Sequence, residues 1–114
     1  MADCLFCSIA AGDIPATVVR EDDLTVAFRD LDPQAPTHVL VIPRVHAPDV
    51  GTLAASEPEA LVAVARAAAE VARAEGVADS GWRLVFNTGR DAGQSVAHVH
   101  GHVLGGRDLG WPPG

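Results

Sequence analysis

Three of the five histidines alternate along one short segment, at His98, His100 and His102. Alternate residues of a strand point to the same face, so the spacing predicts that the three imidazoles line one face. A neutral imidazole is a competent nucleophile when its other ring nitrogen is tied to a carbonyl, which fixes the tautomer. Two other interpretations stay open. One is polar decoration of an edge strand, which lysine or threonine would serve better; the other is a metal site, although three ligands in line rarely converge tetrahedrally.

The loop before this segment supplies groups that could bind an anion. Residues 93–95 read Gly-Gln-Ser, and they offer backbone N–H groups, an amide and a hydroxyl beside the imidazoles. Chemistry at phosphorus requires a nucleophile on one side and preorganised donors around the equatorial oxygens. The loop and the histidines together therefore predict phosphoryl or nucleotidyl transfer.

A second group of potential ligands is the CxxC motif of Cys4 and Cys7. The motif fits a redox dithiol, a pair of small buried residues, or half of a zinc site. A redox dithiol is expected after a strand and before a helix in a βαβ unit, and no strand is predicted before this motif. Zinc needs two more ligands, and His46 and His98 are available for a closed site with two cysteines and two histidines.

The composition narrows the class of ligand. The chain has 114 residues, a net charge of −7 and no lysine. A nucleic-acid polymer is not expected as a partner because its phosphates normally require clustered lysine and arginine, whereas backbone N–H groups can bind one small phosphate. No signal peptide or membrane-spanning stretch is recognisable, and the two cysteines are too close to cross-link distant segments. We therefore expect a reduced, cytoplasmic protein with no membrane partner.

The hydrophobic pattern predicts the elements that must position these groups. Strands are expected at residues 17–20, 24–28, 38–42, 82–87 and 97–104, and a short N-terminal helix at residues 7–11. One long helix is expected from a capping box at Ser56 and Glu59 to Gly76. Together they predict one α+β domain over residues 1–114, with one long helix on an antiparallel sheet of about five strands. The other face of the sheet needs cover, which favours a homodimer.

The run His98-Val-His-Gly-His-Val-Leu104 resembles the signature of the histidine-triad (HIT) superfamily. Its surroundings are similar to one branch, the HINT-type purine nucleoside phosphoramidases, at Asn87 and at residues 27–43, 93–96, 105–107 and 111–114. The resemblance covers nearly the whole chain. It implies a HIT-like fold and a hydrolase that cleaves the P–N bond of purine nucleoside 5′-phosphoramidates. One difference is Gly101, where these hydrolases usually have a bulkier apolar residue, and glycine weakens a strand interior.

The resemblance also implies a role for each site residue. His100 would attack the α-phosphorus and form a transient nucleotidyl-histidine, and His98, His102 and Ser95 would complete the catalytic set. Asp30 would accept hydrogen bonds from both ribose hydroxyls. The other nucleotide contacts would come from Phe6, Phe28 and Leu31 around the purine, and from Asn87, Gln94, Ser95, Val96, His100 and His102 around the phosphate. For Phe6 and Leu31, simple core packing is an equally good interpretation.

Two further expectations follow from the family. Its zinc-bearing members have the arrangement of Cys4, Cys7, His46 and His98, which implies a structural zinc. Nucleotidyl transferases of the superfamily tend to have glutamine at the third triad position, so His102 favours water as the final acceptor. The alternatives in function are a dinucleoside polyphosphate hydrolase and a non-catalytic nucleotide-binding module. His38 is either a core histidine with a backbone partner or a group hydrogen-bonded near His98 and His100.

Overall fold

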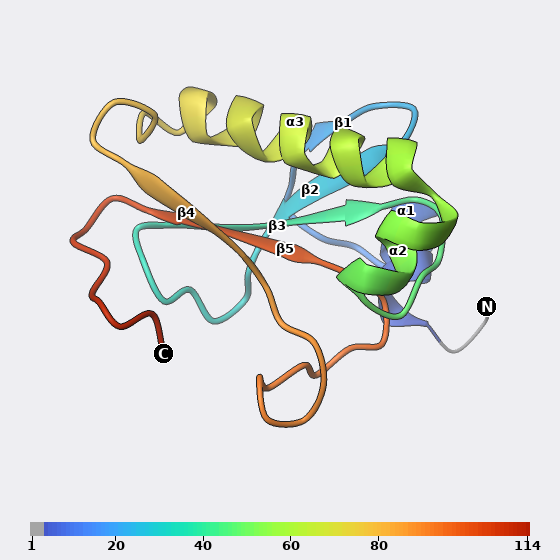
Figure 1. The fold of residues 1–114 in the computed structure, drawn as a ribbon. Helices are drawn as coiled ribbons and strands as arrows, with labels where there is room; N and C mark the ends of the chain where they lie inside the picture. Colours follow the sequence, from blue (N-terminus) through green and yellow to red (C-terminus); the bar gives the residue numbers. More distant parts are fainter. Residues whose placement is uncertain (1–3) are drawn as a thin grey trace.

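Five strands form one antiparallel sheet in the order β1-β2-β3-β5-β4, which confirms the predicted α+β architecture (Figure 1). The structure is a computed structural model, and it describes residues 4–114. The strands are β1 (Val18–Glu21), β2 (Thr25–Arg29), β3 (Thr37–Pro43), β4 (Trp82–Phe86) and β5 (Gly101–Gly105). The helices are α1 (Leu5–Ala10), α2 (Val50–Ser56) and α3 (Pro58–Ala74). No helix within residues 4–114 is long and apolar enough to cross a membrane.

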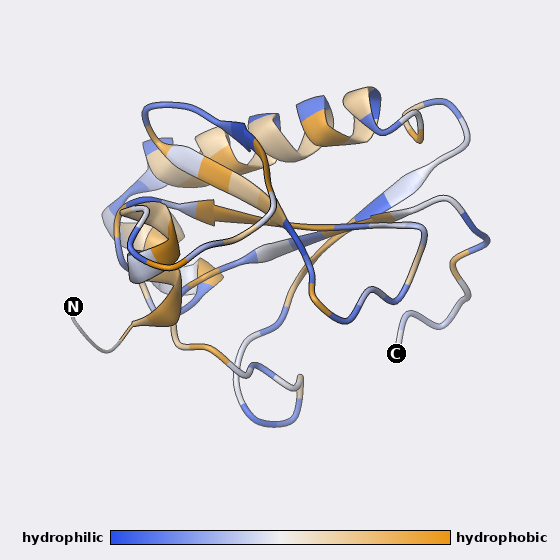
Figure 2. Cartoon of the chain, turned by 180° about the vertical axis from the view of Figure 1, so that it is seen from behind, coloured by the Kyte–Doolittle hydropathy of each residue, from blue (hydrophilic) through white to orange (hydrophobic). Residues whose placement is uncertain are grey.

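The long helix α3 covers one face of the sheet. Its apolar residues recur at helical spacing, and Val64, Ala68 and Val71 are buried against Val39 and Val103 of the two neighbouring strands β3 and β5. On the opposite face α1 contributes to a second apolar cluster with β2 and β3. Every residue of β3 is buried, and the strand is largely hydrophobic in Figure 2, because both of its faces are covered.

The helix α1 carries the cysteine motif into the fold. It begins earlier than the predicted residues 7–11 because Cys4 caps it, with the Cys4 Sγ accepting from the Cys7 backbone N–H at 3.3 Å. Phe6 points into the apolar cluster below the helix and meets the ring of Phe28 edge-on, with centroids 5.5 Å apart. Burial of Phe6 therefore fixes the position of both thiols relative to the sheet.

The predicted capping box at Ser56 and Glu59 is wrong. Ser56 is the last residue of α2, and its hydroxyl donates to the Thr52 carbonyl at 2.8 Å instead of capping the next helix. Glu57 separates the two helices in a non-helical conformation, because a proline disfavours the helical region for the residue before it. The long helix begins at Pro58, whose missing N–H costs nothing in the first turn.

The short helix α2 was not predicted. Asp49 caps it, and its carboxylate accepts from the Thr52 N–H at 2.8 Å. Leu53 is its one buried residue and packs in a small cluster with Ala60 of α3. A single buried position in one segment gives no apolar periodicity, so the hydrophobic pattern did not indicate a helix there.

The predicted strand at residues 97–104 is too long at its beginning, because β5 starts at Gly101. The register of β5 against β3 would place Val99 opposite Pro43, and proline has no N–H to donate to a neighbouring strand. The Val99 N–H donates instead to the Ala47 carbonyl at 2.8 Å. The first two histidines of the triad therefore lie on a connection that leads into the sheet, and only the third lies within a strand.

Gly101 makes room for two side chains of β4. A Cβ on Gly101 would lie 2.8 Å from the Leu84 Cδ1 and 3.1 Å from the Phe86 Cε1, which is closer than such atoms normally pack. Phe86 also packs against the cluster of Leu53 and Val99. An aromatic ring from the neighbouring strand therefore occupies the space that a bulkier residue would take.

Gly101→Val is expected to lower the free energy of unfolding by about 1–3 kcal/mol, because the added methyl groups would overlap Leu84 and Phe86. Urea unfolding followed by circular dichroism measures this change. Gly110→Val is the matched control, since a Cβ at Gly110 would have no atom within 4 Å, and it should leave the midpoint nearly unchanged. Equal stability of the Gly101→Val and wild-type proteins would contradict the packing described.

Candidate functional site

A cavity of about 360 Å³ opens beside the histidine segment, between α1, the end of β2 and the loop that precedes β5. Eight of the residues predicted to bind a nucleotide line it: Phe6, Phe28, Asp30, Leu31, Ser95, Val96, His100 and His102. Asn87 and Gln94, which were predicted with them, are not in the lining. A larger hollow of about 800 Å³ between α3 and the β1–β2 turn contains no histidine, cysteine or serine. We therefore place the candidate site at the smaller cavity.

The cavity wall includes apolar residues that the sequence analysis missed. Leu5 and Ile9 of α1, Leu40 of β3 and the turn at residues 14–17 complete the wall. Thr17 was predicted as the first residue of a strand, and residues 14–16 are apolar and carry no chemical group that would have indicated a site. Their contribution depends on how α1 lies on the sheet, which residue types alone do not indicate.

The hydrogen bond of His100 fixes its tautomer. The His100 Nδ1 lies 2.8 Å from the carbonyl oxygen of His98, and a carbonyl only accepts, so Nδ1 carries the proton. The other nitrogen, Nε2, then has a lone pair. The ring is buried, and Phe6 packs edge-on against it with centroids 5.0 Å apart. In its neutral form, His100 thus has the single tautomer that the nucleophile hypothesis requires.

A chain of hydrogen bonds fixes the protons of His38 and His102. The backbone N–H of Gln34 donates to the His38 Nδ1 at 3.0 Å, so the neutral ring carries its proton on Nε2. That Nε2 lies 2.9 Å from the His102 Nδ1 and donates to it. The proton of His102 is therefore on its own Nε2, which is buried and has no hydrogen-bond partner within residues 4–114. His102 thus has a spare N–H donor and lines the cavity.

His102 is uncharged at neutral pH. Burial, together with the neighbouring rings of His100 and His38, lowers the pKa of His102 to about 4 against the opposing effect of the Asp30 carboxylate. The neutral ring keeps one N–H and one acceptor nitrogen, as the chain from Gln34 requires. The two histidines at the cavity therefore have opposite arrangements, with a lone pair on Nε2 of His100 and a proton on Nε2 of His102.

Asp30 lies at the end of this chain, with its Oδ2 3.5 Å from the His38 Nε2. Ligand atoms of Asp30, His38 and His102 lie within 4.8 Å of one another, which also fits a metal site. A metal on the His38 Nε2 would move the ring proton to Nδ1, where it would oppose the Gln34 N–H. We therefore interpret this group as a hydrogen-bonded chain. The structure combines the two interpretations of His38, because its buried ring has a backbone partner in the Gln34 N–H and is also hydrogen-bonded to His102, in place of His98 or His100.

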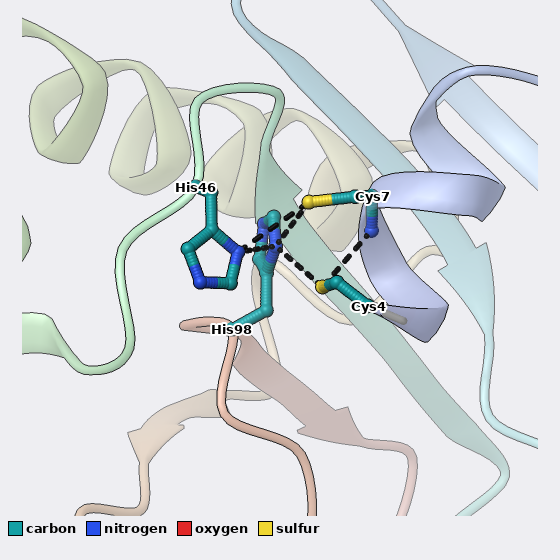
Figure 3. Close-up of side chains that lie close together, drawn as sticks. All are labelled: Cys4, Cys7, His46 and His98. Atoms are coloured by element: carbon teal, nitrogen blue, oxygen red, sulfur yellow. Dashed lines mark hydrogen bonds between the residues drawn. The ribbon is translucent and has the colours of Figure 1, made fainter. Parts of the chain in front are cut away.

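Cys4, Cys7, His46 and His98 converge at the beginning of the histidine segment (Figure 3). The His98 Nδ1 lies 3.4 Å from each Sγ and 3.2 Å from the His46 Nδ1. The Cys7 Sγ also lies 3.4 Å from the His46 Nδ1. The His98 Nε2 donates to the Pro43 carbonyl at 2.9 Å, so its Nδ1 has a lone pair directed at the other three groups. Converging lone pairs and thiols are typical of a cation site.

The spacing of these atoms fits a tetrahedral zinc site. Zn–N bonds of about 2.0–2.1 Å and Zn–S bonds of about 2.3 Å place neighbouring ligand atoms roughly 3.3–3.6 Å apart. The 3.2 Å and 3.4 Å separations are close to these values. Burial and the adjacent Cys4 raise the pKa of the Cys7 thiol, whereas redox-active CxxC motifs have a lowered thiol pKa. The spacing of the cluster is therefore compatible with zinc, and the direction of the Cys7 shift does not favour a redox dithiol.

His98 joins this cluster to the cavity. Its ring belongs to the cluster, while its carbonyl oxygen accepts the Nδ1–H of the next triad histidine. Phe6 makes a second connection, because it lies between the two cysteines on α1 and packs against both His98 and His100. A change in the cluster therefore reaches the candidate nucleophile through the backbone and through an aromatic contact.

The cavity has little positive charge. Arg29 is the one arginine in its lining, and its guanidinium forms two hydrogen bonds with the Glu75 carboxylate, at 2.8 Å and 3.0 Å. These bonds, together with the charge of Glu75, raise the pKa of Arg29. Within residues 4–114, no lining arginine is thus left for a phosphate chain, and the remaining polar groups are neutral or acidic.

These features agree with comparisons to known proteins. The HIT domain family model matches residues 11–109, and the chain belongs to this family. The chain is 50% identical to a HIT family hydrolase from Legionella pneumophila, with a TM-score of 0.94 and coverage of 98% of this chain and 100% of that one. The protein is therefore a HIT-family hydrolase, as the histidine spacing and its surroundings predicted.

Two named relatives refine this class. The purine nucleoside phosphoramidase of Escherichia coli strain K12 is 47% identical over 106 residues, which cover 93% of this chain and 89% of the relative. A 14 kDa zinc-binding protein of Zea mays is 47% identical over 112 residues, which cover 96% of this chain and 87% of the relative.

Proposed function

We propose that this protein hydrolyses the P–N bond of purine nucleoside 5′-phosphoramidates. The observation that carries the proposal is the fixed tautomer of His100, which leaves a lone pair on the Nε2 of a buried ring at the cavity. The name of the 47% identical Escherichia coli relative supports the substrate class. The same cavity offers an apolar wall, a carboxylate and a hydroxyl, which suit a base, a ribose and a phosphate.

The proposed reaction has two steps. The Nε2 of His100 forms a bond to the α-phosphorus, the P–N bond breaks, and the amine leaves with a proton taken from solvent, which the second step returns to solvent. Water then attacks the nucleotidyl-histidine, which releases a nucleoside monophosphate and restores the neutral ring. Ser95 and the Nε2–H of His102 donate to the phosphate oxygens and to the departing amine. His98 acts through its carbonyl, which holds the His100 proton on Nδ1 throughout.

The rest of the cavity would bind the nucleoside. The Asp30 carboxylate accepts from the two ribose hydroxyls, and Phe6 and Phe28 form the wall against the purine. The side chain of Leu31 is fully exposed, at 100%, so this leucine is not part of the core. A contact with the bound base would give the exposed side chain a role. The Val96 N–H completes the phosphate contacts, and Asn87, outside the cavity lining, would approach the phosphate from its rim.

Hydrolysis of dinucleoside polyphosphates is the second candidate, and the charge of the cavity disfavours it. Sites for several linked phosphates normally use arginine, lysine or a metal ion to offset the charge. The one arginine of this lining is bound to Glu75. Steady-state rates on an adenosine phosphoramidate and on a diadenosine polyphosphate distinguish the two functions. If the protein turns over neither substrate but binds a nucleoside monophosphate tightly, the result would support a non-catalytic nucleotide-binding module.

We further propose that Cys4, Cys7, His46 and His98 hold a structural zinc. The donor set and its spacing support this, as does the name of the maize relative. Bound zinc would supply rigidity between α1, the segment after β3 and the triad segment. A closed four-ligand site has no open position for activating water, so the reacting groups are those of the protein and the substrate.

A homodimer is expected in solution. The strand β4 lies at one edge of the sheet with its residues only half-buried, and a second copy would pair with this edge and cover it. Sedimentation at micromolar concentration should give twice the chain mass of 11.8 kDa. A single species at 11.8 kDa across a tenfold concentration range would contradict the dimer.

A further inference from the structure

The side chain of Gln94 uses all of its donor groups within the protein. Its Nε2 donates to the Pro48 carbonyl at 2.6 Å and to the Val96 carbonyl at 3.0 Å, and its Oε1 accepts from the Gly89 N–H at 3.0 Å. An amide has two N–H groups, and both are engaged. The side chain is therefore fixed in one orientation and has no donor left for a ligand.

These bonds close the loop at residues 89–94 and fasten it to another part of the chain. The Gln94 backbone N–H donates to the Gly89 carbonyl at 3.1 Å, so the two residues are joined by a backbone bond and a side-chain bond. Pro48 follows His46 by two residues, and the Ala47 between them accepts the Val99 N–H at 2.8 Å. The segment at residues 46–48 thus anchors both the loop and the triad segment.

The two residues that follow Gln94 line the cavity, whereas Gln94 itself does not. We propose that Gln94 is a positioning residue, which holds Ser95 and the Val96 N–H at the phosphate by fastening their loop to the Pro48 carbonyl. This proposal rests on the proposed function for the identity of the ligand. It replaces the direct phosphate contact that the family resemblance implied for Gln94.

Two glycines in this loop adopt backbone conformations with positive φ, so the sequence itself restricts the loop backbone little. Gly89 and Gly93 have φ values of 84° and 79°, a region that glycine enters at no steric cost. Without the Gln94 amide, the backbone bonds from Gln94 to Gly89 and from Gly93 to Arg90 would still close the loop, but the side-chain bond that fastens it to Pro48 would be lost. Displacement of a reacting group by about 1 Å can cost roughly 100-fold in rate.

Kinetics test the proposal with two variants and a control. Gln94→Ala removes all three side-chain bonds, and Gln94→Glu keeps the acceptor for the Gly89 N–H but removes both donors. Each should lower kcat/KM for an adenosine phosphoramidate by roughly 10- to 100-fold. Arg90→Gln alters the same loop at an exposed side chain whose hydrogen bonds within residues 4–114 are to Asp91, and it should leave kcat/KM unchanged. A Gln94→Glu enzyme with wild-type kcat/KM would overturn the proposal.

A double-mutant cycle separates positioning from general destabilisation. If Gln94 acts through Ser95, the change Ser95→Ala should cost several-fold less in the Gln94→Ala enzyme than in the wild type, because the hydroxyl is already displaced there. A residue that only stabilises the fold would leave the effect of Ser95→Ala undiminished. Full additivity of the two changes would therefore overturn the proposal.

Hydrogen exchange tests the same idea without any turnover. Amides of residues 88–96 should exchange at least several-fold faster in Gln94→Ala than in the wild type, while amides of β3 remain protected and Arg90→Gln matches the wild type. If the wild-type protein cleaves no phosphoramidate but the loop amides respond in this way, the proposed function fails and Gln94 still positions the loop. Unchanged exchange at residues 88–96 in Gln94→Ala would show that the fastening is absent.

Discussion

His100→Ala is expected to lower the turnover of an adenosine phosphoramidate by roughly 10⁴-fold or more, by analogy with the loss of nucleophiles elsewhere. The change removes the Nε2 that would attack phosphorus, and no other group in the cavity has a fixed lone pair at the same position. Binding of a nucleoside monophosphate should remain largely intact, because the apolar wall, Asp30 and Ser95 are unchanged. Rapid-mixing kinetics and equilibrium titration with the monophosphate measure the two quantities.

Two controls make this result specific to a covalent nucleophile. His102→Ala should be less damaging, since it removes a hydrogen-bond donor and leaves the attacking atom. His100→Gly should regain part of its activity with added imidazole, or on a substrate that already carries an imidazole leaving group. An acid-labile phosphohistidine adduct should be trapped by rapid quench in the wild type. Near-normal turnover of His100→Ala, or failure to trap any adduct when its hydrolysis is slowed, would contradict the mechanism.

Cys4→Ser is expected to reduce both the zinc content and the stability of the purified protein. If the change weakens the affinity for zinc by about 100-fold, the free energy of unfolding at a fixed zinc concentration falls by about 2.7 kcal/mol. For a domain of this size that corresponds to roughly 10 °C in Tm. Metal analysis and thermal denaturation, on protein purified without added metal, measure the two effects. A strong chelator should destabilise the wild type in the same direction.

Ser8→Ala is a matched control for this experiment, because Ser8 lies on the same helix and is outside the cluster. It should retain one zinc per chain and a Tm close to that of the wild type. Well-folded wild-type protein without metal, in which Cys4 and Cys7 readily form a disulfide, would contradict the zinc proposal. The redox interpretation of the motif would then be the better one.

The sequence predicted the candidate site more fully than it predicted the elements that hold it. Period-two spacing predicted that the three imidazoles share one face. The alternation persists into residues 98–100 even though these precede β5, because Phe6 packs against both His98 and His100 while Val99 lies in the cluster with Leu53. The spacing could not indicate the tautomers. Those depend on the Gln34 N–H meeting His38 and on the His98 carbonyl meeting the next histidine, contacts that the folded backbone sets.

The errors in the fold have local causes. Pro43 has no N–H to donate to residue 99, so the strand β5 begins later than predicted. Pro58 moves the start of the long helix from the predicted Ser56 to Pro58. In both places a proline outweighed the apolar pattern. The extent of the domain over residues 1–114, the roles of the site residues and the cytoplasmic location stay predictions.

The close packing at Gly101 restricts the order in which this sequence can change. A larger side chain at position 101 meets the ends of the Leu84 and Phe86 side chains, so these must shift, or a smaller residue must replace one of them, to make room. A smaller residue at position 86, introduced while position 101 is still glycine, leaves a void beside Leu53 and Val99. Both single substitutions therefore carry a cost that the pair does not. In a library of single variants, positions 101 and 86 should each score as intolerant, while among related sequences their sizes should vary in opposite directions.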